Sequence, residues 1–293
     1  MFYKINLKMK SFSCFIISPI IIIIIAFCCT VSCTSDELPE KYGQVGTQLY
    51  VGAEKNQALI VGLGGSEGGN AWTSDYWKKT RDQMLDSGYA LLALEYFGGP
   101  NSPEQLDRIA IDSVYKVIKA ATAHPMINGN KIALIGGSKG AELALLLASK
   151  YPDIDCVVSI VGSHATFPAL TFMASTSSWI YQGKEVAYVP LPWSAVPALL
   201  KQDLRTAFSE MLTDTAEVQK SLIDVNAITG SILMVSATQD EMWPSTEMSE
   251  EIMCQLKEND FSHPYQHIAI AGSHQAPLQH FDTIIHFLNK NFR

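Results

Sequence analysis

The chain has 293 residues, of which 47% are hydrophobic and 17% charged, and its formal net charge is −8 at pH 7. The acidic balance and the lack of a basic stripe exclude a protein that binds nucleic acid through an electrostatic surface. The length suits one large domain, or one domain with an inserted cap.

The first 32 residues have the layout of a secretory signal peptide. Lys4, Lys8 and Lys10 form a basic head, and an apolar run over residues 12–27 follows. This run is short for a membrane span, which needs about 20 residues. We therefore predict that residues 1–32 are a targeting segment, with an uncleaved single-span anchor as the alternative.

Cys33 follows this segment directly after the small residue Ser32. The arrangement resembles the lipobox of bacterial lipoproteins, although Thr30 stands where that motif usually has leucine. The resemblance implies a lipid on Cys33, a polar tether over residues 33–45, and an exported bacterial lipoprotein anchored to a membrane.

Two of the six cysteines, Cys156 and Cys254, lie far beyond the leader. One falls in an expected strand and the other in an expected helix, so we predict separate thiols rather than a disulfide. Since no Cys/His cluster has the spacing of zinc ligands, no metal site is expected.

Short apolar runs alternate with helical patterns from residue 57 to residue 290. The expected strands are 57–62, 89–96, 131–135, 156–161, 231–236 and 266–271, and the expected helices are 71–87, 103–123, 141–150, 245–257 and 278–290. Continuous apolar strands are typical of a parallel sheet that is buried on both faces. The alternation predicts an α/β fold with a mostly parallel, doubly wound sheet.

Residues 164–229 interrupt this alternation, with a helical pattern near 196–212 and no clear strand. Such long segments are usually functional, so we predict a cap inserted into a domain that spans residues 46–293. The cap contains the aromatic residues Phe167, Phe172, Trp179, Tyr181, Tyr188 and Trp193. They either line an apolar pocket or form the core of the cap, and the sequence leaves both interpretations open.

A Gly-x-Ser-x-Gly motif over residues 136–140 separates the expected strand 131–135 from the helix that follows. The motif places its serine in a sharp, strained turn, and the glycines let strand and helix pass closely. We interpret Ser138 as a nucleophile and the Lys139 amide as an oxyanion donor. A helix N-cap serine after a glycine turn is the structural alternative.

A serine nucleophile needs a base and an orienting acid, and in folds with this motif they follow in the order Ser, acid, His. His274, just past the last expected strand, is favoured as the base. Asp240, just past strand 231–236, is favoured as the acid, with Glu241 as the alternative.

The glycine-rich loop 64–69 follows the first expected strand, where a second oxyanion donor is needed. By position we predict the amide of Ser66. A nucleotide cradle is the alternative, since Gly62-x-Gly64 begins a dinucleotide motif, but Glu67 occupies the place of its third glycine. A nucleotide-dependent oxidoreductase is therefore disfavoured, and no cofactor is expected.

Several blocks resemble the catalytic domain shared by acyl-CoA thioesterases and bile acid-CoA:amino acid N-acyltransferases. These blocks are residues 64–69, 95–98, 135–145 and Asp240 with 243–245. The resemblance spans about residues 55–290 and implies an α/β-hydrolase fold. It also implies a triad of Ser138, Asp240 and His274. The N-acyltransferases use cysteine as nucleophile, so the serine of this chain favours hydrolysis.

The sequence thus predicts a lipid-anchored serine hydrolase that cleaves small acyl esters or thioesters through an acyl-enzyme intermediate. The alternative is a non-catalytic surface lipoprotein that binds an apolar ligand with a hydrolase fold. Larger members of the family carry a β-sandwich domain before the catalytic one, and the short spacing between Cys33 and residue 57 predicts its absence here.

Overall fold

The structure is a computed structural model that describes residues 37–292. The predicted signal peptide, the lipid attachment at Cys33 and the first part of the tether lie outside the described residues and stay predictions. Within residues 37–292, no helix has both the length and the apolar character needed to cross a membrane.

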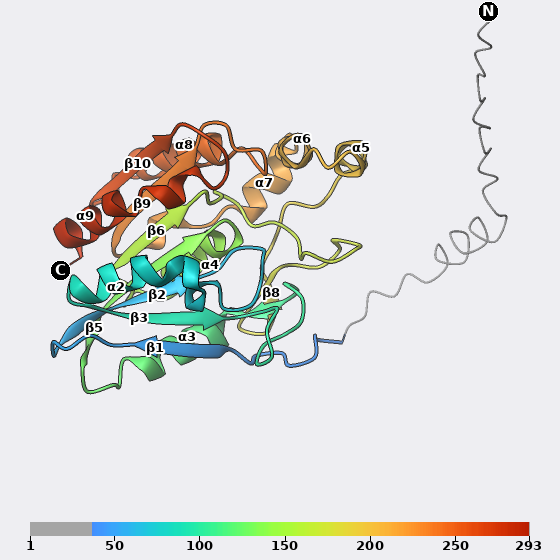
Figure 1. Cartoon of the computed structure of the whole chain (residues 1–293). Helices are drawn as coiled ribbons and strands as arrows, with labels where there is room; N and C mark the ends of the chain where they lie inside the picture. Colours follow the sequence, from blue (N-terminus) through green and yellow to red (C-terminus); the bar gives the residue numbers. More distant parts are fainter. Residues whose placement is uncertain (1–36, 293) are drawn as a thin grey trace, which may run out of the picture. The chain divides into compact units, whose positions relative to one another are not determined.

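Seven strands form the central sheet in the order β1-β3-β2-β5-β6-β9-β10 (Figure 1). They are β1 (Gly46–Tyr50), β2 (Gln57–Leu63), β3 (Tyr89–Glu95), β5 (Ile127–Gly137), β6 (Cys156–Ile160), β9 (Ser231–Ala237) and β10 (Tyr265–Ile270). Only β1 runs antiparallel to its neighbour, β3. The predicted mostly parallel α/β architecture is confirmed. The edge strand β1 was not predicted, because its mixed burial gives a weak strand pattern.

Helices cover both faces of this sheet, as the apolar strands require. Side chains of β2 alternate between two apolar clusters: Leu59 packs on the side of Val114 and Leu143, and Ile60 on the side of Met84 and Ile284. The first side carries α3 (Ile111–Ala121), α4 (Lys139–Lys150) and α8 (Ser245–Glu258), and the second carries α2 (Lys78–Asp86) and α9 (Phe281–Asn291). A strand with apolar residues on both faces is therefore buried in the middle layer.

Two predicted helices are shorter than the sequence pattern indicated. The segment predicted as helix from residue 71 begins with two 3₁₀ turns, η1 (Ala71–Thr73) and η2 (Asp75–Trp77), because Ser74 between them is extended with ψ 160°. The helix predicted from residue 103 starts only at Ile111. Before it, the amide of Ile109 donates to Ser178 O at 2.8 Å, which draws the backbone into a strand, β4 (Ile109–Ala110).

The segment predicted as a cap lies between β6 and β9. It contains β7 (Trp179–Tyr181), β8 (Lys184–Glu185), η3 (Trp193–Ala195), α5 (Val196–Leu200), α6 (Leu204–Met211), α7 (Thr215–Ser221) and η4 (Val225–Ala227). The helix expected near 196–212 is thus two helices. β7 pairs with β4 and β8 in a three-stranded sheet, whose strands are too short to give a pattern in the sequence. In Figure 1, α5 and α6 lie on the side toward which the parallel strands point.

Candidate active site

Ser138 occupies the turn between β5 and α4 with φ 52° and ψ −119°. A non-glycine residue rarely adopts this conformation, and it is the strained turn that the motif predicts. A Cβ on Gly136 would lie 2.0 Å from Gly140 O, and a Cβ on Gly140 would lie 2.2 Å from Gly64 O. The glycines therefore allow the strand, the helix and the neighbouring loop to approach each other, which holds the serine at the edge of the sheet.

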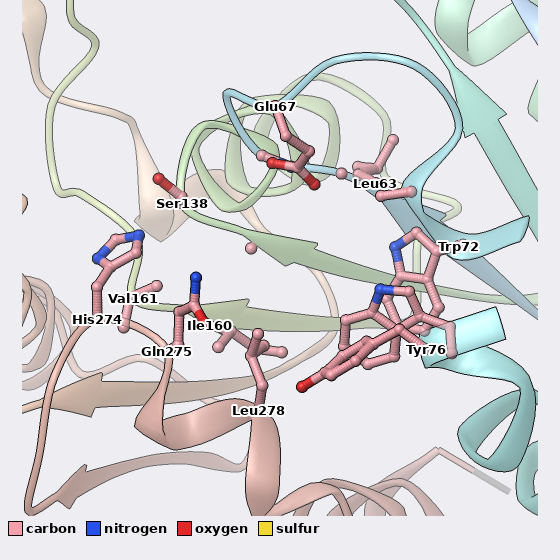
Figure 2. A pocket seen from close by; sticks show the side chains of 15 residues that line it. Leu63, Glu67, Trp72, Tyr76, Ser138, Ile160, Val161, His274, Gln275 and Leu278 are labelled. Atoms are coloured by element: carbon pink, nitrogen blue, oxygen red, sulfur yellow. The ribbon is translucent and has the colours of Figure 1, made fainter. Parts of the chain in front are cut away.

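A cavity of about 350 Å³ opens beside this turn. In Figure 2, Ser138 and His274 lie at one side of it, and Trp72 and Tyr76 at the other. The residues in its wall are Leu63, Gly64, Gly65, Glu67, Ala71, Trp72, Tyr76, Trp77, Gly137, Ser138, Ile160, Val161, His274, Gln275 and Leu278. The structure thus brings the predicted nucleophile and the predicted base to one cavity at the carboxyl ends of the strands.

The ring of His274 is held from behind by Asp240. His274 Nδ1 lies 2.8 Å and 2.9 Å from the two carboxylate oxygens of Asp240. Asp240 itself is only 1% exposed. The amide of Met242 also donates to Asp240 Oδ1, at 2.9 Å. Burial raises the pKa of Asp240, but the hydrogen bonds from His274, Ser245 and the Met242 amide, together with the charge of His274, outweigh burial and hold the pKa below its usual value. Asp240 is therefore an ionised acceptor for the imidazole.

Glu241, the alternative acid, makes a different contact. Its Oε2 accepts a hydrogen bond from the backbone amide of His274 at 2.9 Å. It therefore holds the loop that carries the histidine, whereas Asp240 holds the ring. The geometry favours Asp240 as the partner of the base.

The glycine-rich loop presents other groups to the cavity than the sequence suggested. Ser66 is exposed and is not among the residues of the cavity wall, whereas Gly65 is buried there. The Gly65 amide donates to Glu67 Oε1 at 3.0 Å. Two oxyanion donors were predicted. Lys139 is the first residue of α4 and directly follows Ser138, whereas Ser66 is not part of the cavity wall.

The side chain of Lys139 turns into the interior. Its Nζ lies 2.8 Å and 2.9 Å from the two carboxylate oxygens of Glu142, and both residues are buried. Glu142 Oε1 also accepts from Trp179 Nε1 at 2.6 Å and from the Phe167 amide at 3.2 Å. Burial lowers the pKa of Lys139 although the Glu142 carboxylate opposes this effect. The pair connects the start of α4 to the segment 164–229 next to Ser138.

The aromatic residues of the segment predicted as a cap do not line the cavity. Phe167 and Trp179 are buried in apolar clusters, and Phe172 and Trp193 are exposed by 101% and 89%. Phe167 packs in a cluster formed largely by the segment 164–229, and Trp179 packs in the main core beside the sheet. None of the four supplies a pocket, and only Phe167 favours a separate core for this segment.

The cavity takes its aromatic wall from the segment before α2 instead. Trp72, Tyr76 and Trp77 line it, and the rings of Trp72 and Trp77 stack with centroids 4.4 Å apart. None of these three residues was predicted from the sequence to line a site. Their position in the chain could have indicated this role. Residues 71–77 follow the glycine-rich loop 64–69 and therefore begin at the same edge of the sheet as that loop.

The two remaining cysteines are separate thiols, as predicted: Cys156 is buried and Cys254 is exposed. In the described range 37–292, no group of three or more His, Cys, Asp or Glu side chains is arranged to hold a metal ion.

Residues 115–275, more than half of the chain, match the family BAAT / Acyl-CoA thioester hydrolase C terminal. The chain belongs to this family. Acyl-coenzyme A thioesterase 1 of Rattus norvegicus is 25% identical over 221 residues, which cover 75% of this chain and 49% of the relative. Acyl-coenzyme A amino acid N-acyltransferase 1 of Mus musculus is 23% identical over 176 residues, which cover 59% of this chain and 39% of the relative. This member of the family thus spans about half the length of the curated relatives it matches, or less.

Solved structures support the fold of this family member. A puromycin-hydrolyzing peptidase of Mycobacterium tuberculosis superposes with a TM-score of 0.60 at 13% identity, over 85% of this chain and 37% of the peptidase. The α/β hydrolase GrgF from Penicillium superposes with a TM-score of 0.55 at 13% identity, over 85% of this chain and 94% of GrgF. At such low identity these likenesses establish the α/β-hydrolase fold alone.

Proposed function

We propose that the chain is a serine hydrolase that cleaves acyl thioesters or esters through an acyl-enzyme intermediate on Ser138. The observation that carries this proposal is the convergence of three groups. Ser138 stands on a strained turn, His274 lines the same cavity, and the buried Asp240 carboxylate holds the His274 ring through Nδ1. A helix N-cap serine needs no such partners.

In the proposed reaction, the Ser138 hydroxyl oxygen attacks the acyl carbonyl while His274 Nε2 accepts its proton. Asp240 stabilises the imidazolium that forms. The bond to the leaving thiol or alcohol then breaks, and His274 returns the proton to it. A water molecule releases the acyl group by the same steps, with His274 again acting as base.

The tetrahedral intermediate carries a negative oxygen that needs two amide donors. We propose the Lys139 amide as the first, since it begins α4 next to the nucleophile. For the second we propose the Gly65 amide in place of the Ser66 amide expected from the sequence, because Gly65 is the residue of the pair that lines the cavity.

The relatives favour thioesters among the possible substrates, since several of them are named acyl-coenzyme A thioesterases. Ser138, rather than a cysteine, at the nucleophile position favours water over an amine as the final acceptor of the acyl group. A thioester that is cleaved no faster than the oxygen ester of the same acid would count against this preference.

A serine-directed fluorophosphonate probe and a thioester hydrolysis assay test the proposal on the full chain. We expect labelling and turnover in the unmodified protein, and loss of both in Ser138→Ala and in His274→Ala. Ser149→Ala is the matched control, since this serine lies on α4 and bonds to Leu146 O outside the cavity wall. Labelling that persists in Ser138→Ala would contradict the proposal. Absence of labelling and turnover in the unmodified protein would favour the non-catalytic alternative.

A further inference from the structure

We infer that Glu67 makes the cavity selective for acyl groups that carry a fixed positive charge, such as a trimethylammonium group a few methylenes from the carbonyl. This inference rests on the proposed function, because it concerns the acyl group that Ser138 would accept.

Glu67 stands close to the reacting position. A Cβ built on Gly65 would lie 2.8 Å from Glu67 Oε2 and 3.3 Å from Ser138 Cβ, so both atoms border the same small space. Figure 2 shows the Glu67 side chain on the wall between Ser138 and Leu63. A group attached to the acyl chain can therefore meet this carboxylate while the carbonyl is at Ser138.

Among the described residues, no cation pairs with the carboxylate of Glu67. The ion pairs of residues 37–292 do not include Glu67, and its Oε2 takes part in no hydrogen bond with these residues. Within the described chain, the cavity wall contains no lysine or arginine, and Glu67 is its single acidic residue. The cavity thus carries a negative charge that a substrate is free to neutralise.

The opposite wall suits a quaternary ammonium group. The faces of Trp, Tyr and Phe rings attract cations, and Tyr76 and Trp77 line this cavity. The ring of Trp72 lies between Gly62 and Trp77, so it supports Trp77 rather than meeting a cation itself. Because Tyr76 is 65% exposed, that wall is reached from solvent. A carboxylate on one side and aromatic rings on the other form a site that an anionic acyl group would not enter.

The contact between Glu67 and Gly65 couples charge recognition to the reaction. Glu67 Oε1 accepts the Gly65 amide, which is the proposed second oxyanion donor. The oxygen of the tetrahedral intermediate has to replace this carboxylate, and two negative oxygens on one amide repel each other. A cation on the acyl group gives the displaced carboxylate a new partner, whereas a neutral acyl group gives it none.

A matched pair of thioesters tests the inference on the full chain. One carries a trimethylammonio-butyryl group on N-acetylcysteamine, and the other carries its uncharged isostere, in which a tert-butyl group replaces the trimethylammonium group. We expect kcat/KM for the cationic thioester to exceed that for the isostere by about tenfold, the combined effect of an exposed ion pair and a cation–π contact. The preference should shrink as salt is raised, because Glu67 is exposed.

Glu67→Gln keeps an oxygen for the Gly65 amide but removes the charge. We expect the ratio between the two thioesters to fall from about ten to about two to five in this variant, because the ion pair is lost while the cation–π contact remains. The fall should come mainly from a lower kcat/KM for the cationic thioester. Asp75→Asn is the matched control, since Asp75 is an acid of η2 that lies outside the cavity wall, and the ratio should stay near ten.

Several outcomes would overturn the inference. Equal kcat/KM for the two thioesters with Ser138-dependent turnover would remove it and leave the proposed hydrolase intact. Thiocholine places the quaternary ammonium group on the leaving thiol. If the thiocholine thioester of the tert-butyl acyl group were preferred over its N-acetylcysteamine thioester by the same factor, the cation would be recognised in the leaving group instead of the acyl group. If no thioester is cleaved, the hydrolase proposal is wrong, and calorimetry then measures the binding of the two thioesters to Ser138→Ala. Tighter binding of the cationic thioester than of its isostere supports the inference. Equal binding of the two overturns it.

Discussion

At the scale of single residues, the most informative contact is that between the His274 ring and Asp240. Two carboxylate oxygens within 2.9 Å of Nδ1 fix the tautomer that leaves Nε2 without a proton. In the proposed mechanism, Nε2 then accepts the proton of Ser138. The contact predicts that the charge and acceptor character of Asp240 matter more than its volume.

Asp240→Asn tests this point with almost no change in shape. The amide group can donate to Nδ1 and stabilise the tautomer that carries its proton on Nε2. We therefore expect kcat/KM for a thioester to fall by about 10³–10⁴-fold, while the free energy of unfolding stays nearly unchanged. Glu241→Gln is the control, because its amide oxygen still accepts the backbone amide of His274. An equal loss in both variants would show that the loop, not the Asp240 carboxylate, orients the base.

At the scale of elements, the crossing of β5 and α4 decides where Ser138 stands. A Cβ on Gly136 would lie 2.0 Å from Gly140 O, whereas a Cβ on Gly137 would meet nothing within 4 Å. The two adjacent glycines therefore differ in purpose. The first is needed for close packing, and the second leaves room beside the cavity.

This difference gives a paired prediction. Gly136→Ala should lower the free energy of unfolding by about 3 kcal/mol or more, because backbone atoms have to move. Gly137→Ala should change it by less than about 1 kcal/mol. Urea unfolding of both variants measures the difference, and similar values for the two would contradict the packing interpretation.

At the scale of the whole molecule, a buried histidine links stability to pH. His164 follows β6, is 6% exposed, and its Nδ1 has no hydrogen-bond partner within the described structure. Burial lowers the pKa of His164 from 6.5 to about 4. The folded protein thus keeps this ring neutral at a pH where the unfolded chain protonates it.

The unfolded chain binds more protons than the folded one between pH 6.5 and about 4, so stability rises with pH in this window. The contribution is fully present above pH 6.5, and about 3 kcal/mol is lost as the pH falls through the window. We expect His164→Leu to flatten the dependence, as measured by urea unfolding at several pH values. Burial also lowers the pKa of His267, so a residual slope of the same sign should remain. Equal slopes in the variant and the unmodified protein would contradict this assignment.

Local pattern was enough to predict six of the seven strands of the sheet and to select the candidate triad residues. A buried parallel strand needs an unbroken apolar run, and a nucleophile turn needs glycines at fixed spacing. Ser138 and Asp240 each follow such a strand, whereas His274 follows the edge strand β10, which is only partly buried and contains polar residues. All three residues stand at the carboxyl ends of parallel strands, so their placement at one edge of the sheet follows from chain order.

The sequence by itself therefore determined the α/β-hydrolase fold, the family and the candidate triad. Only the tertiary structure decided that Gly65 rather than Ser66 lines the cavity, and that the aromatic wall comes from Trp72, Tyr76 and Trp77 rather than from the cap. It also placed the Glu67 carboxylate beside Ser138. The physical reason is that the path of a loop depends on contacts with segments far away in the sequence. Strand periodicity and motif spacing carry no information about those contacts.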